Sequence, residues 1–405
     1  MKKTIKDIDL AGKRALVRVD YNVPVDEATG RITDDARIRE TLPTLQYLLD
    51  AGASIVLLAH FGRPKGKVVE AMRLKTIASY LQELMKRDVH YSTEAVGLEA
   101  EAMVKTLAPG QILVLENTRF YPGEESNDPL FAAALATPGY DVYVNDAFGA
   151  AHRAHASTEG VARVLKAEGK PCVAGLLMAR ELEFLGQLLQ EPQRPFVAIL
   201  GGVKVSDKIG VIRNLLPKVD TLIVGGAMGY AFERAQNRPV GTSYFKEEDA
   251  PIAAELIELA RENGYDFRLP SDFLVADRDA VDAHTEIVPA GMIPLNMMGM
   301  DIGPETIATY SGIIENAKTV LWNGPMGRFE VAPFSRGTLE VAKAVARATD
   351  KGALTIIGGG DSAAAVKQMD LDDQMSHVST GGGASLEFLE GQELPGVAVL
   401  DNKVS

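Results

Sequence analysis

The sequence predicts an α/β protein whose two halves are joined by a single helix. Short apolar runs alternate along the chain with stretches whose apolar residues lie three and four positions apart, which is typical of strands alternating with helices. The runs of the first half lead into Arg, His, Asp and Asn, whereas those of the second half lead into glycine. Two halves with different strand ends indicate sites for two different ligands.

The first half contains four expected strands, at 15–19, 55–59, 112–115 and 142–144. Each run is short and nearly continuous, as in strands that are buried on both faces of a parallel sheet. The clearest helix between them covers 74–85, where apolar side chains recur on one face. The first half is therefore expected to be an α/β domain with a parallel sheet.

The helix that joins the halves is expected between Leu177 and Gln190. Its apolar residues fall largely three and four apart, and Pro171 and Pro192 stand near its two ends. Proline lacks a backbone N–H and clashes with the preceding turn, so these two positions are natural stops for a helix.

The second half repeats the alternation, with strands expected at 196–200, 222–224, 319–322, 354–357 and 377–380. Glycines follow all five. Glycine lets backbone N–H groups approach a phosphate closely, and the start of the following helix adds positive partial charge. The loops 358–362 and 381–385 could therefore bind one polyphosphate together, although glycines also serve simply to turn the chain tightly.

Length, charge and cysteine content indicate the number of domains and exclude several classes of protein. A chain of 405 residues points to two or three domains, on a prior of roughly 100–200 residues each. The net charge of −13 argues against a nucleic-acid or anionic-membrane surface. The start of the chain lacks the apolar core of a signal peptide, and no apolar run approaches the roughly 18–20 residues of a membrane span. Cys172 is the single cysteine, so an internal disulfide is excluded and a soluble cytosolic protein is expected.

Basic residues at the strand ends of the first half predict an anion site. Open parallel sheets bind ligands beyond the carboxyl ends of their strands, and a guanidinium group matches the geometry of a phosphate or carboxylate. One such arginine alone is more often a surface group, but several at neighbouring strand ends favour a binding site. The candidates are Arg37, His60, Arg63, Arg119 and Arg153. His152 and His155 lie three positions apart, but a metal site is not expected from two histidines alone.

Two lysines and an aspartate favour a nucleotide at the glycine loops. Lys204 and Lys208 are four positions apart, so a turn from loop to helix can bring both toward phosphates. Asp361 offers a carboxylate for magnesium, which prefers oxygen ligands. The chain has no P-loop motif of the usual pattern, and 358–363 matches the dinucleotide fingerprint only loosely, without the ribose-binding acid about 20 residues further on.

The environment of the base is left open by the residues alone. The methionines at 297, 298 and 300 could flank a base, but a role in filling the core or a loop is at least as well supported. Glu330 could accept hydrogen bonds from a ribose, or it could be an ordinary surface charge.

Nine motifs together closely resemble phosphoglycerate kinase, in the order of that family and from about residue 5 to Asn402. They are VRVDYNVP at 17–24, HFGRP at 60–64, ENTRF at 116–120, VNDAF at 144–148, AHRAH at 151–155, GGVKVSDK at 201–208, NGPMG at 323–327, GGGDS at 358–362 and STGGGAS at 379–385. Tyr21 stands where the family commonly has phenylalanine, and Thr118 replaces a more usual aliphatic residue.

The resemblance implies two Rossmann-like domains with parallel sheets, joined by an interdomain helix at 171–191. The domain that binds 3-phosphoglycerate would cover 1–170 with a C-terminal segment at about 389–405, and the nucleotide-binding domain would cover 192–388. The enzyme would be a monomer that transfers a phosphoryl group reversibly between 1,3-bisphosphoglycerate and ADP, with Mg²⁺ and closure of its domains. It would act in glycolysis and gluconeogenesis, on small molecules only, with no nucleic-acid or membrane partner.

The same resemblance assigns roles to residues of this chain. The substrate site would contain Asp20, Tyr21, Asn22, Arg37, His60, Phe61, Gly62, Arg63, Arg119 and Arg153. The nucleotide site would contain Lys204, Lys208, Gly299, Asn323, Glu330, Gly358, Gly359, Gly360, Asp361 and Ser362, with Asp361 as the metal ligand. The catalytic residues would be Arg37, Lys204, Gly359, Gly382 and Gly383.

The residues fit such chemistry without a general base, because a carboxylate nucleophile is already ionised at neutral pH. Phosphoryl transfer then depends on alignment and on positive charge around the transferring group. Two other classes of protein remain open from the sequence. A two-lobed binding protein would need neither the lysines nor a magnesium carboxylate, and a dehydrogenase would change nicotinamide absorbance without consuming nucleotide phosphate.

Overall fold

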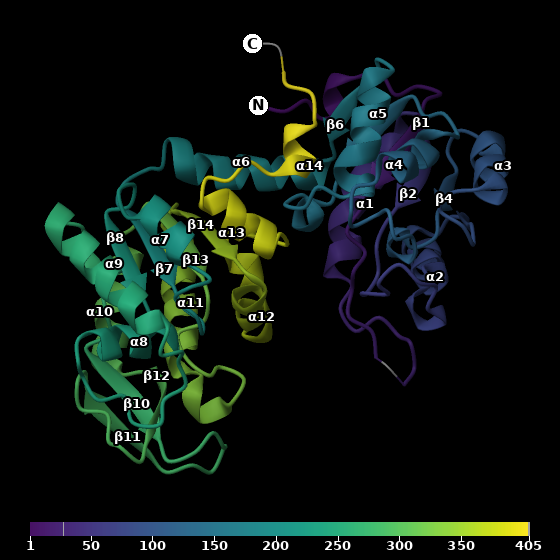
Figure 1. Cartoon of the computed structure of the whole chain (residues 1–405). Coiled ribbons are helices and arrows are strands. Elements are labelled where there is room, and N and C mark those ends of the chain that lie inside the picture. Colours follow the sequence, from purple (N-terminus) through teal and green to yellow (C-terminus); the bar gives the residue numbers. More distant parts are fainter. Residues whose placement is uncertain (27, 404–405) are drawn as a thin grey trace. The chain divides into compact units, whose positions relative to one another are not determined.

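The computed structural model describes residues 1–26 and 28–403, and the chain divides into two compact units (Figure 1). Unit 1 contains Met1–Glu183 and the residues from Glu393 onward, and unit 2 contains Phe184–Gln392. Each unit has its own parallel sheet, which confirms the predicted α/β fold class. Among the described residues, no helix is both long enough and apolar enough to cross a membrane.

The sheet of unit 1 has six parallel strands in the order β3-β4-β2-β1-β5-β6. All five residues of β2 are buried, as expected for a strand with helices on both faces. From edge to edge the strands are β3 (Val89–Tyr91), β4 (Ile112–Val114), β2 (Ser54–Leu58), β1 (Arg14–Arg18), β5 (Val142–Asn145) and β6 (Cys172–Ala174).

Helices flank this sheet (Figure 1). The helix expected at 74–85 is confirmed as α2 (Lys75–Met85), which buries Ile77 and Leu81 and ends where Lys86 adopts a left-handed conformation, with φ of 49°. The others are α1 (Ala36–Asp50), α3 (Leu98–Thr106), α4 (Pro129–Ala136) and α5 (Val161–Ala167). Short helical turns are η1 (Ile5–Asp7), η2 (Glu70–Met72), η3 (Thr118–Phe120), η4 (Phe148–Ala150) and the π-helix η5 (Ala156–Gly160).

Two segments connect the units in sequence. A helix is present at the predicted place as α6 (Leu176–Gln190), and the division between the units falls inside it, after Glu183. The C-terminal segment with α14 (Pro395–Ala398) belongs to unit 1, where Asn145 Nδ2 donates to the carbonyl of Gly396 at 2.9 Å and Asp401 N donates to Cys172 O at 2.8 Å. Residues 393–403 therefore complete the unit that contains the N-terminal residues.

The main sheet of unit 2 has six parallel strands in the order β15-β14-β13-β7-β8-β9. They are β15 (His377–Val378), β14 (Leu354–Gly358), β13 (Thr319–Asn323), β7 (Phe196–Leu200), β8 (Thr221–Val224) and β9 (Phe267–Arg268). The strand expected at 377–380 is shorter than predicted. The Ser379 hydroxyl accepts a hydrogen bond from Gly381 N at 3.1 Å, so the chain already turns into the glycine loop there.

Unit 2 also has a three-stranded antiparallel sheet that the sequence did not predict. Its strands are β11 (Thr285–Pro289), β10 (Asp272–Ala276) and β12 (Met298–Ile302), and they lie at one end of the unit (Figure 1). The helices of unit 2 are α7 (Ile209–Leu215), α8 (Met228–Ala235), α9 (Asp249–Asn263), α10 (Pro304–Glu315), α11 (Arg336–Asp350), α12 (Gly360–Gln368) and α13 (Gly383–Leu389), with the turns η6 (Ala332–Phe334) and η7 (Asp372–Gln374).

Candidate active site

The strand order of each unit places the predicted residues at its natural ligand edge. In unit 1, β1 lies between β2 and β5. The strands β2, β3 and β4 that follow it in sequence lie on one side of β1, and β5 and β6 lie on the other. Parallel sheets bind ligands where the strand order reverses in this way, beyond the carboxyl ends. Asp20 follows β1, His60 follows β2, Arg119 follows β4 and Arg153 follows β5, so the topology brings these four loops to one edge.

Arg18 is a fully buried charged residue at this edge, and it was not predicted from the sequence as a site residue. Its side chain is fully buried, and Nη2 donates to His60 Nδ1 at 2.9 Å, Nε donates to Ser157 Oγ at 2.7 Å, and Nη1 donates to the Val19 carbonyl. The signal in the sequence was an arginine inside an otherwise apolar strand, where a charge needs a purpose because burial is costly.

Two histidines of this edge, His60 and His155, are neutral at neutral pH. Burial first, and then the positive charges of Arg18 and Arg119, hold the pKa of His60 well below its usual range. The same causes lower the pKa of His155 to about 4. Arginine has no acceptor, so His60 Nδ1 must accept the bond from Arg18 and the ring proton must lie on Nε2. At neutral pH the positive charge of the edge therefore resides on its arginines.

The loop after β1 is tied both to α1 and to the loop after β2. Arg37 Nη1 donates to Asp20 Oδ2 at 3.0 Å and to the Asn22 carbonyl at 3.2 Å, while Asn22 Oδ1 accepts from Gly62 N at 2.9 Å. Tyr21 is fully buried and its hydroxyl pairs with Thr41 Oγ1 at 3.0 Å, so its side chain packs in the core beside these polar groups.

The loop after β2 is held from β4. Asn117, which is fully buried, donates from Nδ2 to the carbonyl of Phe61 at 2.7 Å and accepts at Oδ1 from Phe61 N at 3.2 Å. Arg119 Nη1 donates to Gly62 O at 2.9 Å, and burial, together with the charges of Arg18 and Arg63, lowers the pKa of its guanidinium. Arg63 and Arg153 extend to solvent, and Phe61 is buried. Several guanidinium groups at one edge of the sheet are suited to a small anion.

In unit 2 the reversal of strand order lies between β7 and β13, and the loops after β7, β13, β14 and β15 carry the predicted nucleotide residues. Lys208 is buried beneath them. Its Nζ donates to Gly201 O at 2.6 Å, to Asn323 O at 3.0 Å and to Asn323 Oδ1 at 2.7 Å. Burial lowers the pKa of Lys208 to about 8, although the negative charges of Asp361 and Asp207 oppose this shift.

The glycine loop after β14 leaves its backbone open. Gly359 has φ of 87°, and a Cβ there would lie 3.0 Å from Asn323 Nδ2, a buried donor without a hydrogen-bond partner among the described residues. Helix α12 begins immediately after it, at Gly360, with the exposed carboxylate of Asp361 in its first turn. The first N–H groups of α12 have no partner within the helix, and they lie beside the unpaired amide of Asn323, which suits an anion.

The remaining predicted residues of unit 2 differ in burial and in their contacts. Ser362 is fully buried and its hydroxyl accepts from Gly324 N at 2.5 Å, so it braces the loop after β13. Lys204 Nζ pairs with Asp207 Oδ2 at 3.4 Å, and Glu330 Oε2 with Arg328 Nη1 at 3.2 Å. Gly382 has φ of 52° and ends the loop directly before α13, which begins at Gly383.

Two of the methionines near residue 300 lie in the core of unit 2. Met297 packs with Tyr230 and Phe273, and Met300 packs with Phe334. Gly299 lies in β12, where a Cβ would collide with the Tyr230 ring at 2.3 Å. Close packing of the ring therefore accounts for this glycine.

A family described as phosphoglycerate kinase matches residues 5–392. The chain belongs to the phosphoglycerate kinase family. It is 56% identical over 402 residues to the phosphoglycerate kinase of Herpetosiphon aurantiacus and 55% identical over 402 residues to that of Moorella thermoacetica, covering 99% of this chain and 100% of each relative. The solved structure of phosphoglycerate kinase from Coxiella burnetii has a TM-score of 0.88 at 40% identity and covers 98% of both chains.

As a member of the phosphoglycerate kinase family, the chain is an enzyme, a phosphotransferase with a carboxyl group as acceptor. Membership also implies small-molecule substrates, among them ATP or ADP.

Proposed function

We propose that the enzyme transfers a phosphoryl group reversibly between 1,3-bisphosphoglycerate and ADP, giving 3-phosphoglycerate and ATP, with Mg²⁺ and as a step of glycolysis and gluconeogenesis. The observation that carries this proposal is the division of charged groups between the units. Unit 1 presents arginines around a neutral histidine, whereas unit 2 presents a buried lysine beneath open glycine loops. These are separate sites suited to a phosphorylated acid and to a polyphosphate.

Unit 1 would bind 3-phosphoglycerate and unit 2 the nucleotide. Arg37, His60, Arg63, Arg119 and Arg153 would contact the glycerate and its phosphate, together with Asp20, Asn22 and Gly62. Tyr21 and Phe61 are buried and would support this site through packing. On the nucleotide side, Lys204, Lys208, Asn323 and the amides of Gly358, Gly359 and Gly360 would contact phosphates, with Gly299 and Glu330 nearer the nucleoside.

The chemistry needs no proton transfer. In the direction that consumes ATP, an oxygen of the 3-phosphoglycerate carboxylate attacks the γ-phosphorus, a P–O bond forms there, and the bond to the ADP oxygen breaks. Because the nucleophile is already ionised, catalysis consists of alignment and charge stabilisation. Arg37, Lys204 and the backbone N–H groups of Gly359, Gly382 and Gly383 would supply positive charge to the transferring group.

The residues fit a magnesium ion that is carried largely by the nucleotide. No group of three or more His, Cys, Asp or Glu side chains arranged for a metal occurs in 1–26 and 28–403. Magnesium often uses one or two carboxylates with phosphate oxygens, and the exposed Asp361 at the glycine loop provides one. The ion would supply charge that neutralises the phosphates when bound.

Replacing Asp361 by asparagine is expected to weaken MgADP binding by about tenfold and to make nucleotide binding less dependent on magnesium, because the variant keeps the shape but loses the charge. Titration calorimetry with ADP, with and without Mg²⁺, measures this. Asp373→Asn, an exposed aspartate in η7, is the matched control. An Asp361→Asn protein with the parent's MgADP affinity would show that this carboxylate does not hold the metal.

The proposed reaction is tested by coupled turnover of 3-phosphoglycerate with MgATP, omitting each component in turn. Turnover that requires all three components supports it. Tight binding of either ligand without phosphoryl transfer would favour a binding protein, and a nicotinamide-dependent absorbance change without consumption of ATP would favour a dehydrogenase.

We propose that the reaction also requires the two units to close, because each ligand has its own unit whereas the reacting atoms must come to about 3–3.5 Å. Hinges would lie near 169–171, 190–192 and 381–390. Both ligands together are expected to reduce the radius of gyration more than either alone, which small-angle scattering measures. An equal radius of gyration in the apo, singly liganded and ternary samples would contradict closure.

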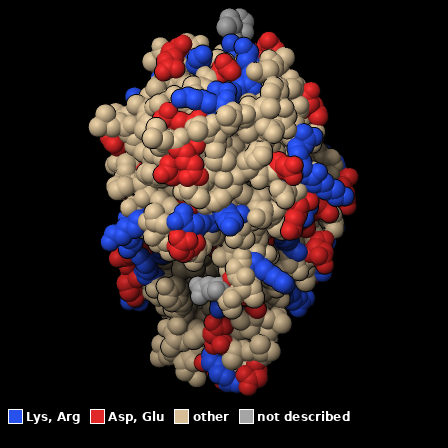
Figure 2. All heavy atoms as spheres, turned by 90° about the vertical axis from the view of Figure 1, so that its right-hand side faces the viewer, with Lys and Arg blue, Asp and Glu red and all other residues tan. Residues whose placement is uncertain are grey.

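We place this enzyme in the cytoplasm as a monomer without nucleic-acid or membrane partners. The net charge of −13 supports the absence of nucleic-acid and membrane partners, since nucleic acids and anionic membranes attract basic proteins. On the face drawn in Figure 2, basic and acidic side chains are interspersed rather than gathered into one basic field.

A further inference from the structure

A chain of buried side chains runs from Glu124 to His60 within unit 1. Glu124 Oε1 accepts a hydrogen bond from Ser157 Oγ at 2.5 Å, Ser157 Oγ accepts from Arg18 Nε at 2.7 Å, and Arg18 Nη2 donates to His60 Nδ1 at 2.9 Å. Glu124, Ser157 and Arg18 are fully buried, and His60 is 7% exposed. Four groups that are distant in the sequence are therefore connected without intervening solvent.

The direction of every hydrogen bond in this chain is fixed by chemistry. Arg18 can only donate, so Ser157 must accept from it and direct its own hydrogen to the carboxylate of Glu124. At the other end, His60 Nδ1 must accept, which leaves the neutral ring with its hydrogen on Nε2. The orientation of Arg18 thus decides which nitrogen of His60 can donate to a ligand.

Arg18 needs a counter-charge because a buried guanidinium is costly by itself. Glu124 is the carboxylate that reaches it, through the Ser157 hydroxyl, and its second oxygen accepts from Ser157 N at 3.0 Å. Glu124 therefore balances the charge of Arg18 and also holds Ser157 in place. Thr118 Oγ1, next to Arg119 in sequence, also lies 3.2 Å from Glu124 Oε1.

We propose that Glu124 is a positioning residue that, through Ser157 and Arg18, holds His60 as a neutral imidazole with its proton on Nε2, ready to donate to the bound acid. The proposal rests on unit 1 being the 3-phosphoglycerate site. In this arrangement the Glu124 carboxylate does not itself contact the ligand, but it sets which nitrogen of His60 donates to the ligand. The charged or titratable groups that act on His60 are Arg18, Arg119, His155 and Arg37.

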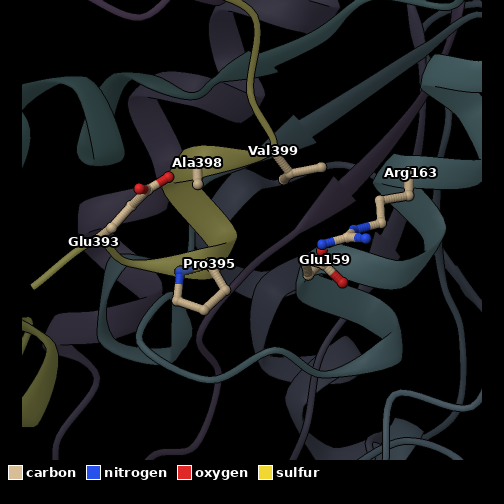
Figure 3. A pocket seen from close by; sticks show the side chains of 6 residues that line it. All are labelled: Glu159, Arg163, Glu393, Pro395, Ala398 and Val399. Carbon is tan, nitrogen blue, oxygen red and sulfur yellow. The ribbon is translucent and has the colours of Figure 1, made fainter.

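The competing interpretation is that Glu124 only fixes the entry to η5, which begins at Ala156. Glu159 offers a matched control, because it is a buried carboxylate of the same turn but pairs with Asn127 Nδ2 at 2.6 Å and with Arg163. It lines a pocket of about 350 Å³ with residues of α5 and the C-terminal segment, where its side chain lies beside Arg163 (Figure 3). None of the predicted substrate residues lines this pocket.

The first test is ¹⁵N NMR of the histidine-labelled protein near pH 7, with the His60 signals assigned from a His60→Gln variant among the six histidines. The expected spectrum shows Nδ1 without a proton and Nε2 with one. A wild-type His60 that is cationic, or that carries its proton on Nδ1, would overturn the proposal whatever the variants do.

The second test compares Glu124→Gln and Ser157→Ala with the control Glu159→Gln. The first two are expected to yield mixed tautomers of His60 and to raise the KM for 3-phosphoglycerate by about tenfold, the effect of one lost hydrogen bond, with the KM for MgATP unchanged. Glu159→Gln is expected to change neither. Unchanged His60 spectra in folded Glu124→Gln and Ser157→Ala proteins would leave Glu124 a purely structural role.

The outcomes separate this proposal from the proposed function. The positioning role is supported if His60 carries its proton on Nε2 in the parent and shows mixed tautomers in Glu124→Gln. This holds even if 3-phosphoglycerate fails to bind. In that case the substrate assignment is wrong. If 3-phosphoglycerate binds but the His60 signals do not change in Glu124→Gln, the substrate assignment stands and the positioning role of Glu124 is wrong.

Discussion

Replacing Arg37 by alanine is expected to lower kcat by about 10²–10³ with little loss of stability, because it removes a charge that we assign to the transferring group. Arg37 is partly exposed and contacts Asp20 Oδ2 at 3.0 Å and the Asn22 carbonyl at 3.2 Å, so its removal leaves no buried charge unpaired. Steady-state kinetics with thermal unfolding of both proteins measures this.

The control for this variant is Arg39→Ala. Arg39 belongs to the same helix, α1, and pairs with Asp35 Oδ2 at 2.7 Å on the exposed face. It should keep the parent's kcat because an exposed ion pair of this kind contributes little. A folded Arg37→Ala enzyme whose kcat stays within a few-fold of the parent would remove Arg37 from the catalytic residues.

Replacing Lys208 by methionine is expected to lower kcat/KM for MgATP by at least about 10², because the variant loses a positive charge beneath the polyphosphate. The methionine keeps an apolar chain of similar length but leaves the Gly201 carbonyl and both oxygens of Asn323 without this donor. Some loss of stability, about 1–3 kcal/mol, should accompany it. Calorimetry and kinetics on the folded variant give both quantities.

Lys208 also predicts a pH dependence. Its pKa in the free protein is about 8, so the ammonium that attracts phosphate is present below that pH and is lost as the pH rises through it. Nucleotide affinity should therefore fall above about pH 8 in the parent, and this fall should be absent in Lys208→Met. Lys218→Met, whose lysine pairs with Asn214 Oδ1 at 2.6 Å, should behave like the parent. Parent-like MgATP kinetics in Lys208→Met would contradict the phosphate role of Lys208.

The buried strands were predictable because their burial appears in the sequence as apolar runs. The four strands expected in the first half begin and end within one residue of β1, β2, β4 and β5. By contrast, β3 is partly exposed and β11 has four exposed residues of five, so neither forms an apolar run that would reveal a strand. Exposure therefore explains why β11 was missed, whereas β10 is mostly buried and its apolar run 273–276 was overlooked.

The candidate site was predictable where position along a strand was enough. The loops after β1, β2 and β4 carry Asp20, His60 and Arg119, and the topology brings these loops to one edge. The direction of a side chain was not predictable in the same way. Tyr21 and Ser362 belong to the motifs, but both are fully buried and form internal hydrogen bonds. Their partners, Thr41 and Gly324, come from other segments, so the motifs alone did not reveal this burial.

Arg18 marks the limit of sequence reasoning here. A run of apolar residues with one arginine reads as a strand, and nothing local shows that Ser157, 139 positions later, and His60 receive its hydrogen bonds. Contacts between segments far apart in the chain decide the charge and the tautomer of the site, and these exist only in the fold.

The most direct measurement of the central claim, one ligand on each unit, is a two-reporter NMR titration. Trp322, the single tryptophan, lies in β13 of unit 2 with Nε1 donating to Gly324 O at 2.7 Å, and His60 lies at the arginine edge of unit 1. If each ligand binds its own unit, 3-phosphoglycerate alone should shift the His60 ring signals and leave the indole signal in place, whereas MgADP alone should do the reverse. Both ligands shifting the same reporter and leaving the other unchanged would contradict this claim.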